Sequence, residues 1–368
     1  MLNTRLLKND ERAILSLRSL YEKYGYQPYK MSKFEEYDLY VKNKDFLVSD
    51  SVITFNDTNG KLLALKPDVT LSIIKNSTDE AGCKEKVYYN ENVYRVWGST
   101  RQFKEIMQTG LECIGDIDTY DVFEVLYLSL KSLAEISGSF VLDISHLGIL
   151  NALLNTVSES ESFRGEIMTC FKQKNAHEID SICEKYGVSS ESCALLKSFV
   201  SIYGTPSQVI ATLKEINAGD EFTACVGELD SLCNLLAKTE YRDNIRIDFS
   251  IVNDMNYYNG VVFNGFIDGV PETVLFGGSY DKLLARMNRK SRGIGFAIYL
   301  DLLEAIQGSA KKYDVDVLLM YSDKTDVLDL NSTVERLVGE GKSVSVQKAI
   351  PTKLRYRELL DISREAQK

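Results

Sequence analysis

The spacing of apolar residues separates the chain into helical and extended segments. Apolar side chains recur every three or four residues, as in amphipathic helices, at 10–24, 119–136, 147–157, 189–203, 206–217 and near 280–287. Shorter alternating or continuous apolar runs bounded by turn residues predict strands at 45–55, 61–66, 86–97, 106–114, 139–145, 245–253, 261–267 and 272–277. A final strand and helix are expected at 293–308. Asn59-Gly60, between two such runs, predicts a hairpin.

Three polar residues mark where helices should begin. We expect Asp10 to cap the first helix and Asp118 or Thr119 to start the helix at 119–136. Thr205 followed by Pro206 predicts another start, because proline fits the first helical position.

The order of these elements favours an α+β fold over an alternating α/β fold. Residues 1–310 form the main body, an antiparallel sheet with flanking helices and a helical insertion at about 158–241. Residues 311–368 form a small C-terminal α/β module. Its expected elements are a strand at 314–321, a helix at 328–339, a strand at 342–347 and a helix at 352–366.

Composition and charge exclude several classes of protein. The chain has 43 Lys and Arg against 53 Asp and Glu, a formal net charge of −10, which argues against a broad electrostatic grip on nucleic acid. No apolar run is long enough to span a membrane. The seven cysteines are widely spaced and form no C-x-x-C pair, and the chain has only two histidines, which argues against a zinc site or a disulfide framework. We therefore expect reduced thiols in a cytoplasmic protein. We expect no metal and no cofactor.

Four polar clusters interrupt the apolar pattern, at 66–70, 104–115, 256–263 and 276–281. On an extended strand Gln108, Gly110 and Glu112 share one face, and burying two such polar groups is costly unless they have partners. A solvated sheet face is the alternative explanation. Paired glycines at 277–278 would let a ligand or another backbone segment approach closely.

Taken in order, these clusters resemble the catalytic core of class II histidyl-tRNA synthetases. The matching patterns, between about residues 10 and 308, are P-D-x-T, Q-x-G-x-E-x-x-G, Y-Y-x-G-x-V-F, G-G-x-Y-D and G-I-G-F-A. The resemblance implies the class II antiparallel sheet and a histidine-binding pocket. In that pocket Asp68 and Thr70 would hold the ammonium, Gln108 and Glu112 would contact the carboxylate and imidazole, and Tyr258 would assist the imidazole. The other implied binding residues are Arg95, Tyr257, Gly278 and Tyr280.

The residues that serve ATP chemistry in that family are largely replaced. Arg95 is kept, but Trp97 stands where motif 2 has a glutamate. Asn253 occupies the position of a catalytic arginine, and Leu302 that of the ATP-binding arginine of motif 3. Neither Asn nor Leu can clamp developing phosphoryl charge as arginine does. We therefore expect no aminoacylation and assign no catalytic residue.

A kept histidine pocket without ATP chemistry resembles the regulatory subunit of ATP phosphoribosyltransferase. The resemblance implies a homodimer that joins short catalytic subunits in a hetero-octamer. It also implies that the subunit is required for the first step of histidine biosynthesis and mediates feedback inhibition, with L-histidine as effector. Lys66, Met107 and Ser279 depart from that family's usual residues, which bears on ligand affinity more than on fold.

Two other functions remain open at this point. The chain could be a free-standing synthetase-like enzyme that activates histidine, with Arg95 supporting nucleotide binding. It could also be a binding module that uses the synthetase-like core as a scaffold for another partner.

Overall fold

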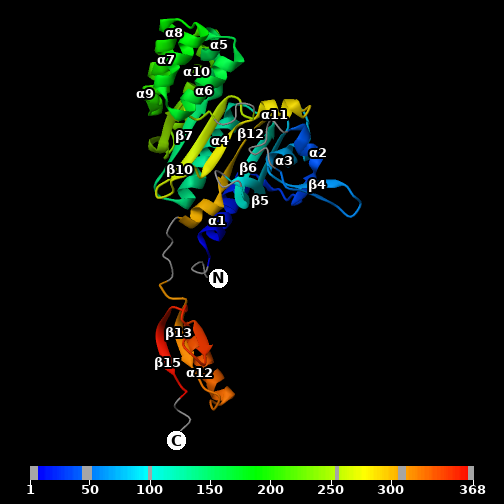
Figure 1. The fold of residues 1–368 in the computed structure, drawn as a ribbon, viewed down its shortest axis with the longest axis vertical. Helices are drawn as coiled ribbons and strands as arrows, with labels where there is room; N and C mark the ends of the chain where they lie inside the picture. The colour runs from blue at the N-terminus through cyan, green and yellow to red at the C-terminus, as the bar shows by residue number, and fades with distance from the viewer. Residues whose placement is uncertain (1–6, 44–51, 98–101, 253–256, 306–311, 364–368) are drawn as a thin grey trace. The chain divides into compact units, whose positions relative to one another are not determined.

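The computed structural model describes residues 7–43, 52–97, 102–252, 257–305 and 312–363 (Figure 1). The chain divides into two compact units, Met1–Ile306 and Gln307–Lys368, and each is described by itself.

A nine-stranded sheet forms the centre of the first unit among the described residues, in the order β1-β5-β6-β12-β11-β10-β7-β9-β8. Its strands are β1 (Gln27–Pro28), β5 (Lys84–Trp97), β6 (Gln102–Gly115), β7 (Phe140–His146), β8 (Tyr203–Gly204), β9 (Ile245–Asp248), β10 (Val261–Ile267), β11 (Leu275–Ser279) and β12 (Arg292–Tyr299). Only the β1–β5 and β7–β9 pairs are parallel within this sheet. The predicted α+β arrangement is confirmed.

The register of the sheet assigns its side chains to two faces. Gln108 pairs with Tyr299, Gly110 with Ala297 and Glu112 with Gly295, so alternate residues of β6 and β12 share a face, as expected for antiparallel neighbours. Leu111 and Phe296 point to the opposite face and join the main apolar core.

Helices α1 (Asn9–Lys23) and α4 (Thr119–Ile136) pack together against that apolar face. Asp118 caps α4 by accepting hydrogen bonds from the backbone N–H groups of Tyr120 and Asp121, as the sequence predicted. The prediction for α1 was wrong in detail, because Lys8 is the N-cap and Asp10 lies in the first turn. In the first turn the acidic side chain of Asp10 still interacts favourably with the positive end of the helix dipole.

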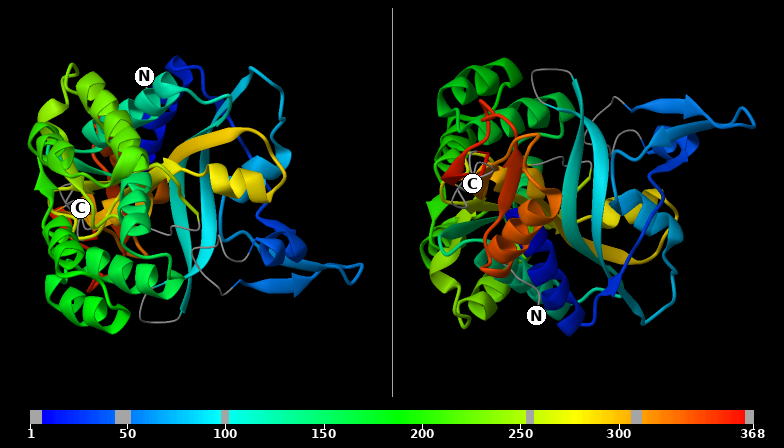
Figure 2. Two further views of the ribbon diagram at one scale, coloured as in Figure 1. Left: turned by 90° about the horizontal axis from the view of Figure 1, so that it is seen from above. Right: turned by 90° about the horizontal axis from the view of Figure 1, so that it is seen from below.

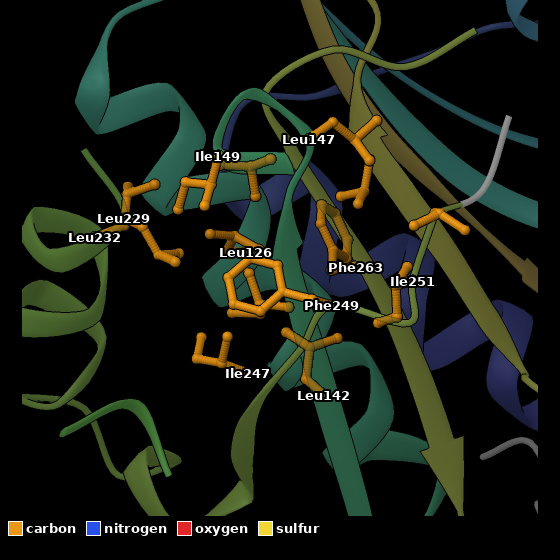
Figure 3. Close-up of a cluster of buried hydrophobic side chains, with 14 of the residues drawn as sticks. Leu126, Leu142, Leu147, Ile149, Leu229, Leu232, Ile247, Phe249, Ile251 and Phe263 are labelled. Carbon is orange, nitrogen blue, oxygen red and sulfur yellow. The ribbon is translucent and has the colours of Figure 1, made fainter. Parts of the chain in front are cut away.

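Five helices lie between α5 (Leu147–Val157) and β9, and gather beside β7 and β10 in Figure 1. They are α6 (Glu161–Gln173), α7 (Ala176–Tyr186), α8 (Ser190–Val200), α9 (Pro206–Glu215) and α10 (Gly219–Leu236). Thr205 and Gln208 form a capping box at the start of α9, with Pro206 in the first turn. Buried apolar side chains of α10, including Leu229 and Leu232, join the same core as Leu142 of β7 and Ile247 of β9 (Figure 3).

A second, three-stranded sheet projects from the β5 end of the main sheet (Figures 1 and 2). It contains β2 (Phe34–Glu36), β3 (Thr54–Asn56) and β4 (Leu62–Leu65), and α2 (Tyr37–Lys42) follows β2. The β3–β4 pair is the expected hairpin, and Gly60 occupies a left-handed conformation in its turn.

The second unit contains a three-stranded parallel sheet in the order β14-β13-β15 and one helix among its described residues. Its elements are β13 (Val315–Met320), α12 (Val327–Gly339), β14 (Val344–Gln347) and β15 (Tyr356–Asp361). The helix expected at 352–366 was wrong. Residues 356–361 have helix-favouring side chains, but backbone pairing of Leu359 and Leu360 with Leu318 and Leu319 outweighs this local preference.

Across the described ranges, no helix is both long and apolar enough to cross a lipid bilayer.

A buried ion pair fixes the segment that enters the pocket region. Lys66 is fully buried, and its Nζ donates to Glu91 of β5. Burial lowers the pKa of Lys66, and Glu91 opposes this shift. The backbone of Lys66 also accepts a hydrogen bond from the Tyr94 N–H at 2.9 Å. Residues 67 and 68 are thereby held against β5.

Removing the charge of Lys66 should therefore destabilise the fold. We expect Lys66→Met to lower the free energy of unfolding by about 3–5 kcal/mol, because it leaves Glu91 without its buried partner. Lys185→Met is the control: it breaks a pair with Glu166 in which both side chains are more than a third exposed, and should cost less than about 1 kcal/mol. Urea unfolding measures both, and equal losses would contradict a special role for Lys66.

Candidate functional site

A cavity of about 450 Å³ opens on the polar face of the sheet. Strands β5, β6, β11 and β12 form its floor, and the start of α3 (Thr70–Asn76) and the segment before β10 contribute to its walls. Eight of the nine residues predicted to bind a ligand line it: Asp68, Thr70, Arg95, Gln108, Glu112, Tyr257, Tyr258 and Tyr280. Its volume lies within the usual range for a small-molecule site.

Glu112 is the central acidic group of this cavity. Thr70 Oγ1 donates to its Oε1 at 2.6 Å, and Tyr280 Oη donates to its Oε2 at 2.7 Å. Burial raises the pKa of Glu112 to about 8, although both hydroxyl donors oppose the shift. Glu112 is only 3% exposed, so the alternative explanation, that this polar sheet face is solvated, is wrong here.

Asp68 and Arg95 form a second buried group. Arg95 Nη2 lies 3.6 Å from Asp68 Oδ2, its Nη1 donates to Tyr299 Oη at 3.0 Å, and its Nε donates to the Pro67 carbonyl. Burial raises the pKa of Asp68, while Arg95 opposes the rise. Asp68 Oδ1 also accepts the Leu71 N–H at 2.9 Å, at the start of α3. The guanidinium is thus held by three partners within the protein.

Gln108 supplies an unsatisfied donor. The residue is 2% exposed, and its Nε2 has no hydrogen-bond partner among the described residues. A buried amide N–H without an acceptor is costly, which favours a ligand that brings an oxygen or unprotonated nitrogen to this point.

The aromatic wall consists of Tyr257, Tyr258 and Tyr280. The rings of Tyr257 and Tyr258 are 4.6 Å apart, and those of Tyr257 and Tyr280 are 6.2 Å apart. Burial raises the pKa of all three phenols. Their hydroxyl groups therefore remain neutral and keep both donor and acceptor capacity.

Glycines make room for these side chains. A Cβ at Gly295 would lie 1.9 Å from Glu112 Oε2, and a Cβ at Gly278 would lie 2.8 Å from the Tyr258 ring. Gly278, the ninth predicted residue, thus lies behind Tyr258 and is absent from the residues that line the cavity. Gly110 beneath Tyr89 and Gly293 beneath Tyr280 are equally crowded.

Eight lining residues are not among the predicted binding residues: Val69, Tyr89, Lys172, Phe276, Gly295, Phe296, Ala297 and Tyr299. Tyr89 pairs with Gly110 and Tyr299 with Gln108, so strand alternation from the predicted residues could have indicated both. No such signal was available for Lys172, which comes from α6. Asn253 and the side chain of Trp97 lie outside the described residues.

No cluster of three or more potential metal-binding His, Cys, Asp or Glu side chains occurs in the described parts of the chain.

The model of the histidyl-tRNA synthetase family matches residues 3–303. The chain belongs to the histidyl-tRNA synthetase family. The sequence patterns align Leu302 with the motif 3 arginine of this family. Leu302 is partly buried and packs against the main apolar core.

Curated relatives within this family carry a more specific name. Proteins named ATP phosphoribosyltransferase regulatory subunit include one from Oceanobacillus iheyensis, 26% identical over 79% of this chain and 72% of the relative. Another, from Alkaliphilus metalliredigens, is 26% identical over 76% of this chain and 72% of the relative. The expected resemblance to these regulatory subunits is confirmed.

Solved structures share the fold of this histidyl-tRNA synthetase family member. One, described as an ATP phosphoribosyltransferase regulatory subunit/histidyl-tRNA synthetase from Bacillus halodurans C, superposes with a TM-score of 0.76 at 21% identity, covering 96% of this chain and 93% of that chain. Histidyl-tRNA synthetase from Nostoc sp. PCC 7120 gives 0.67 at 18% identity, over 94% and 83%. These likenesses establish the expected class II synthetase-like fold.

Adding a methyl group at Gly295 should damage this site. We expect Gly295→Ala to lower the free energy of unfolding by about 1–3 kcal/mol or more, because the new Cβ would meet both Glu112 Oε2 and the Leu111 carbonyl, at 2.4 Å. Gly165→Ala in α6 is the control, since no atom lies within 4 Å of the point where its new Cβ would stand and alanine favours helix by about 0.5–1 kcal/mol. Thermal and urea unfolding would distinguish the two, and an unperturbed Gly295→Ala protein would contradict the close approach.

The raised pKa of Glu112 predicts a pH-dependent contribution to stability. The folded chain keeps the proton up to about pH 8, whereas the usual value is 4.5. The stabilising contribution is therefore full below about pH 4.5 and is lost as the pH rises to about 8, by up to about 1.4 kcal/mol per pH unit.

Comparison with Glu112→Gln isolates this contribution. As the pH rises from 5 to 8, the unmodified chain should lose unfolding free energy relative to the Glu112→Gln variant. The exposed control Glu215→Gln should keep a constant difference from the unmodified chain. Urea unfolding at intervals of one pH unit provides the measurement. A pH-independent difference for Glu112→Gln would rule out the raised pKa.

Proposed function

We propose that this chain is a non-catalytic regulatory subunit of ATP phosphoribosyltransferase. It would act with a short catalytic subunit in the first step of histidine biosynthesis and mediate feedback inhibition by L-histidine. The names of its curated relatives support this function, as does the combination of a retained polar pocket with altered ATP-binding positions.

The observation that carries the proposal is that the Arg95 guanidinium binds partners within the protein. This arginine, the one retained from motif 2, donates to the Pro67 carbonyl and to Tyr299 and forms an ion pair with Asp68, so its guanidinium is directed at partners within the protein. Leu302, at the second arginine position, contacts apolar core instead. Stabilising a transferring phosphoryl group requires cationic donors aimed at it. Leu302 supplies none, and Arg95 is engaged with Asp68, Pro67 and Tyr299.

The pocket nevertheless suits histidine. Asp68 and Thr70 line the cavity and would receive the ammonium group, and Glu112 would accept an imidazole N–H. Gln108 Nε2 offers a donor to a carboxylate or ring nitrogen. The three tyrosines provide apolar faces with polar edges, as imidazole recognition requires.

The proposed assembly is a homodimer that joins catalytic subunits in a cytoplasmic hetero-octamer, without nucleic acid. A solved ATP phosphoribosyl transferase complex from Thermotoga maritima contains a chain of the same fold, with a TM-score of 0.63 at 21% identity over 79% of this chain and 97% of that chain. The likeness supports the type of partner proposed here.

The decisive experiment mixes the purified chain with a short-form catalytic subunit. Light scattering coupled to size exclusion should detect a large complex, and the mixture should form phosphoribosyl-ATP in a reaction that histidine inhibits. Asp68→Asn and Glu112→Gln should each raise the half-inhibitory histidine concentration by about 5–150-fold, equivalent to about 1–3 kcal/mol, while the complex still forms.

Glu215→Gln provides the matched control, because it removes an exposed carboxylate outside the pocket and should leave inhibition unchanged. Absence of both complex and activation would refute the regulatory function. Histidine-dependent ATP–pyrophosphate exchange by the chain alone would instead establish a synthetase-like enzyme.

A further inference from the structure

The helical insertion contributes a cation to the pocket. Lys172, near the end of α6, lines the same cavity as Asp68 and Glu112. Among the lining residues of the described chain, it is the sole one from the segment between β7 and β9. The other lining residues come from the sheet and from the segments joined to it.

The backbone that carries Lys172 is fixed on both sides. Phe171 is buried, and its ring lies 6.0 Å from that of Phe199, which is 4.8 Å from that of Phe249, the residue after β9. Lys174 Nζ pairs with Asp248 Oδ2 at 2.8 Å. The end of α6 is thus attached to the end of β9, while the Lys172 side chain remains exposed.

Lys172 and Arg95 are the two cationic side chains that line the described cavity, and they differ in their partners. Arg95 is held by Asp68, Tyr299 and Pro67. Lys172 has no ion pair or hydrogen bond with any residue that the structure describes. Its ammonium group is therefore available to a ligand.

Such a cation would favour the binding of a free amino acid in this pocket. Its ammonium group can be held by the carboxyl groups of Asp68 or Glu112, but its own carboxylate is repelled wherever those groups are ionised. Gln108 offers a neutral donor, which gives a weaker bond to a carboxylate than a charged donor does.

We infer that Lys172 binds the carboxylate of the amino-acid ligand and thereby connects the helical insertion to the sheet when the pocket is filled. This inference rests on the proposed histidine effector and adds a specificity-determining residue to its site. A ligand with the same imidazole and ammonium groups but without the carboxylate does not use Lys172.

Calorimetric titration of the full-length chain with L-histidine and with L-histidinol tests this role. Histidinol replaces the carboxylate with a hydroxymethyl group. Lys172→Gln should weaken histidine binding by about 5–30-fold, as for a partly exposed charge-assisted bond, and should change histidinol binding by less than about 2-fold. Lys172→Arg, which keeps the charge, should restore most of the histidine affinity.

The matched control is Lys238→Gln, which removes another exposed lysine of the insertion that lies outside the lining of the cavity. It should leave both affinities unchanged. An equal loss for histidine and histidinol in Lys172→Gln, or an unchanged histidine affinity, would overturn the role of Lys172 alone. No histidine binding by the unmodified chain would overturn the proposed effector, and this inference with it.

Hydrogen exchange gives an independent readout of the connection. Histidine should slow amide exchange in residues 161–173 of the unmodified chain, and this protection should be lost in Lys172→Gln at saturating histidine. Equal protection in both proteins would show that the ligand does not act on α6 through Lys172.

Discussion

The pocket exists because the strands beneath it lack side chains at particular positions. Side chains on one sheet face normally fill the space above it, since protein interiors are close-packed. Here Gly295 leaves space for the Glu112 carboxyl group, and Gly278 leaves space for the Tyr258 ring. Gly110 does the same for Tyr89. The polar and aromatic groups can therefore lie close to the sheet, beside an open volume rather than within a filled core.

This arrangement places two buried carboxyl groups and one buried guanidinium beside the cavity. Asp68 is partly compensated by Arg95 and by the Leu71 N–H, whereas Glu112 receives only neutral hydroxyl donors. Burial raises the pKa of both carboxyl groups; a cation opposes the rise at Asp68, whereas only neutral hydroxyl donors oppose it at Glu112. A ligand that brings positive charge or N–H donors would compensate Glu112 further than the two hydroxyl groups do. The cavity would then select ligands by the charge and N–H donors they bring to Glu112, as well as by their shape.

Much of the site could be predicted because strand alternation is a strict geometric rule. Once Gln108 and Glu112 were assigned to one strand, their common face followed, and the register bears this out. The contribution of α6 could not be predicted, because the position of an insertion helix depends on tertiary packing such as that of Phe171. The error at β15 has a related cause: pairing with β13 outweighs the helical preference of residues 356–361.

The parallel pairing of β7 with β9 limits how the chain can be shortened. Adjacent parallel strands cannot be joined by a tight turn, since the chain must return across the length of the sheet before the second strand starts. The helices from α5 to α10 make this return. Excising α6–α10 as a separate module would therefore require a replacement crossover of a dozen or more residues. Variation in the number of helices is compatible with the sheet, whereas loss of the crossover would separate β9 from its place beside β7.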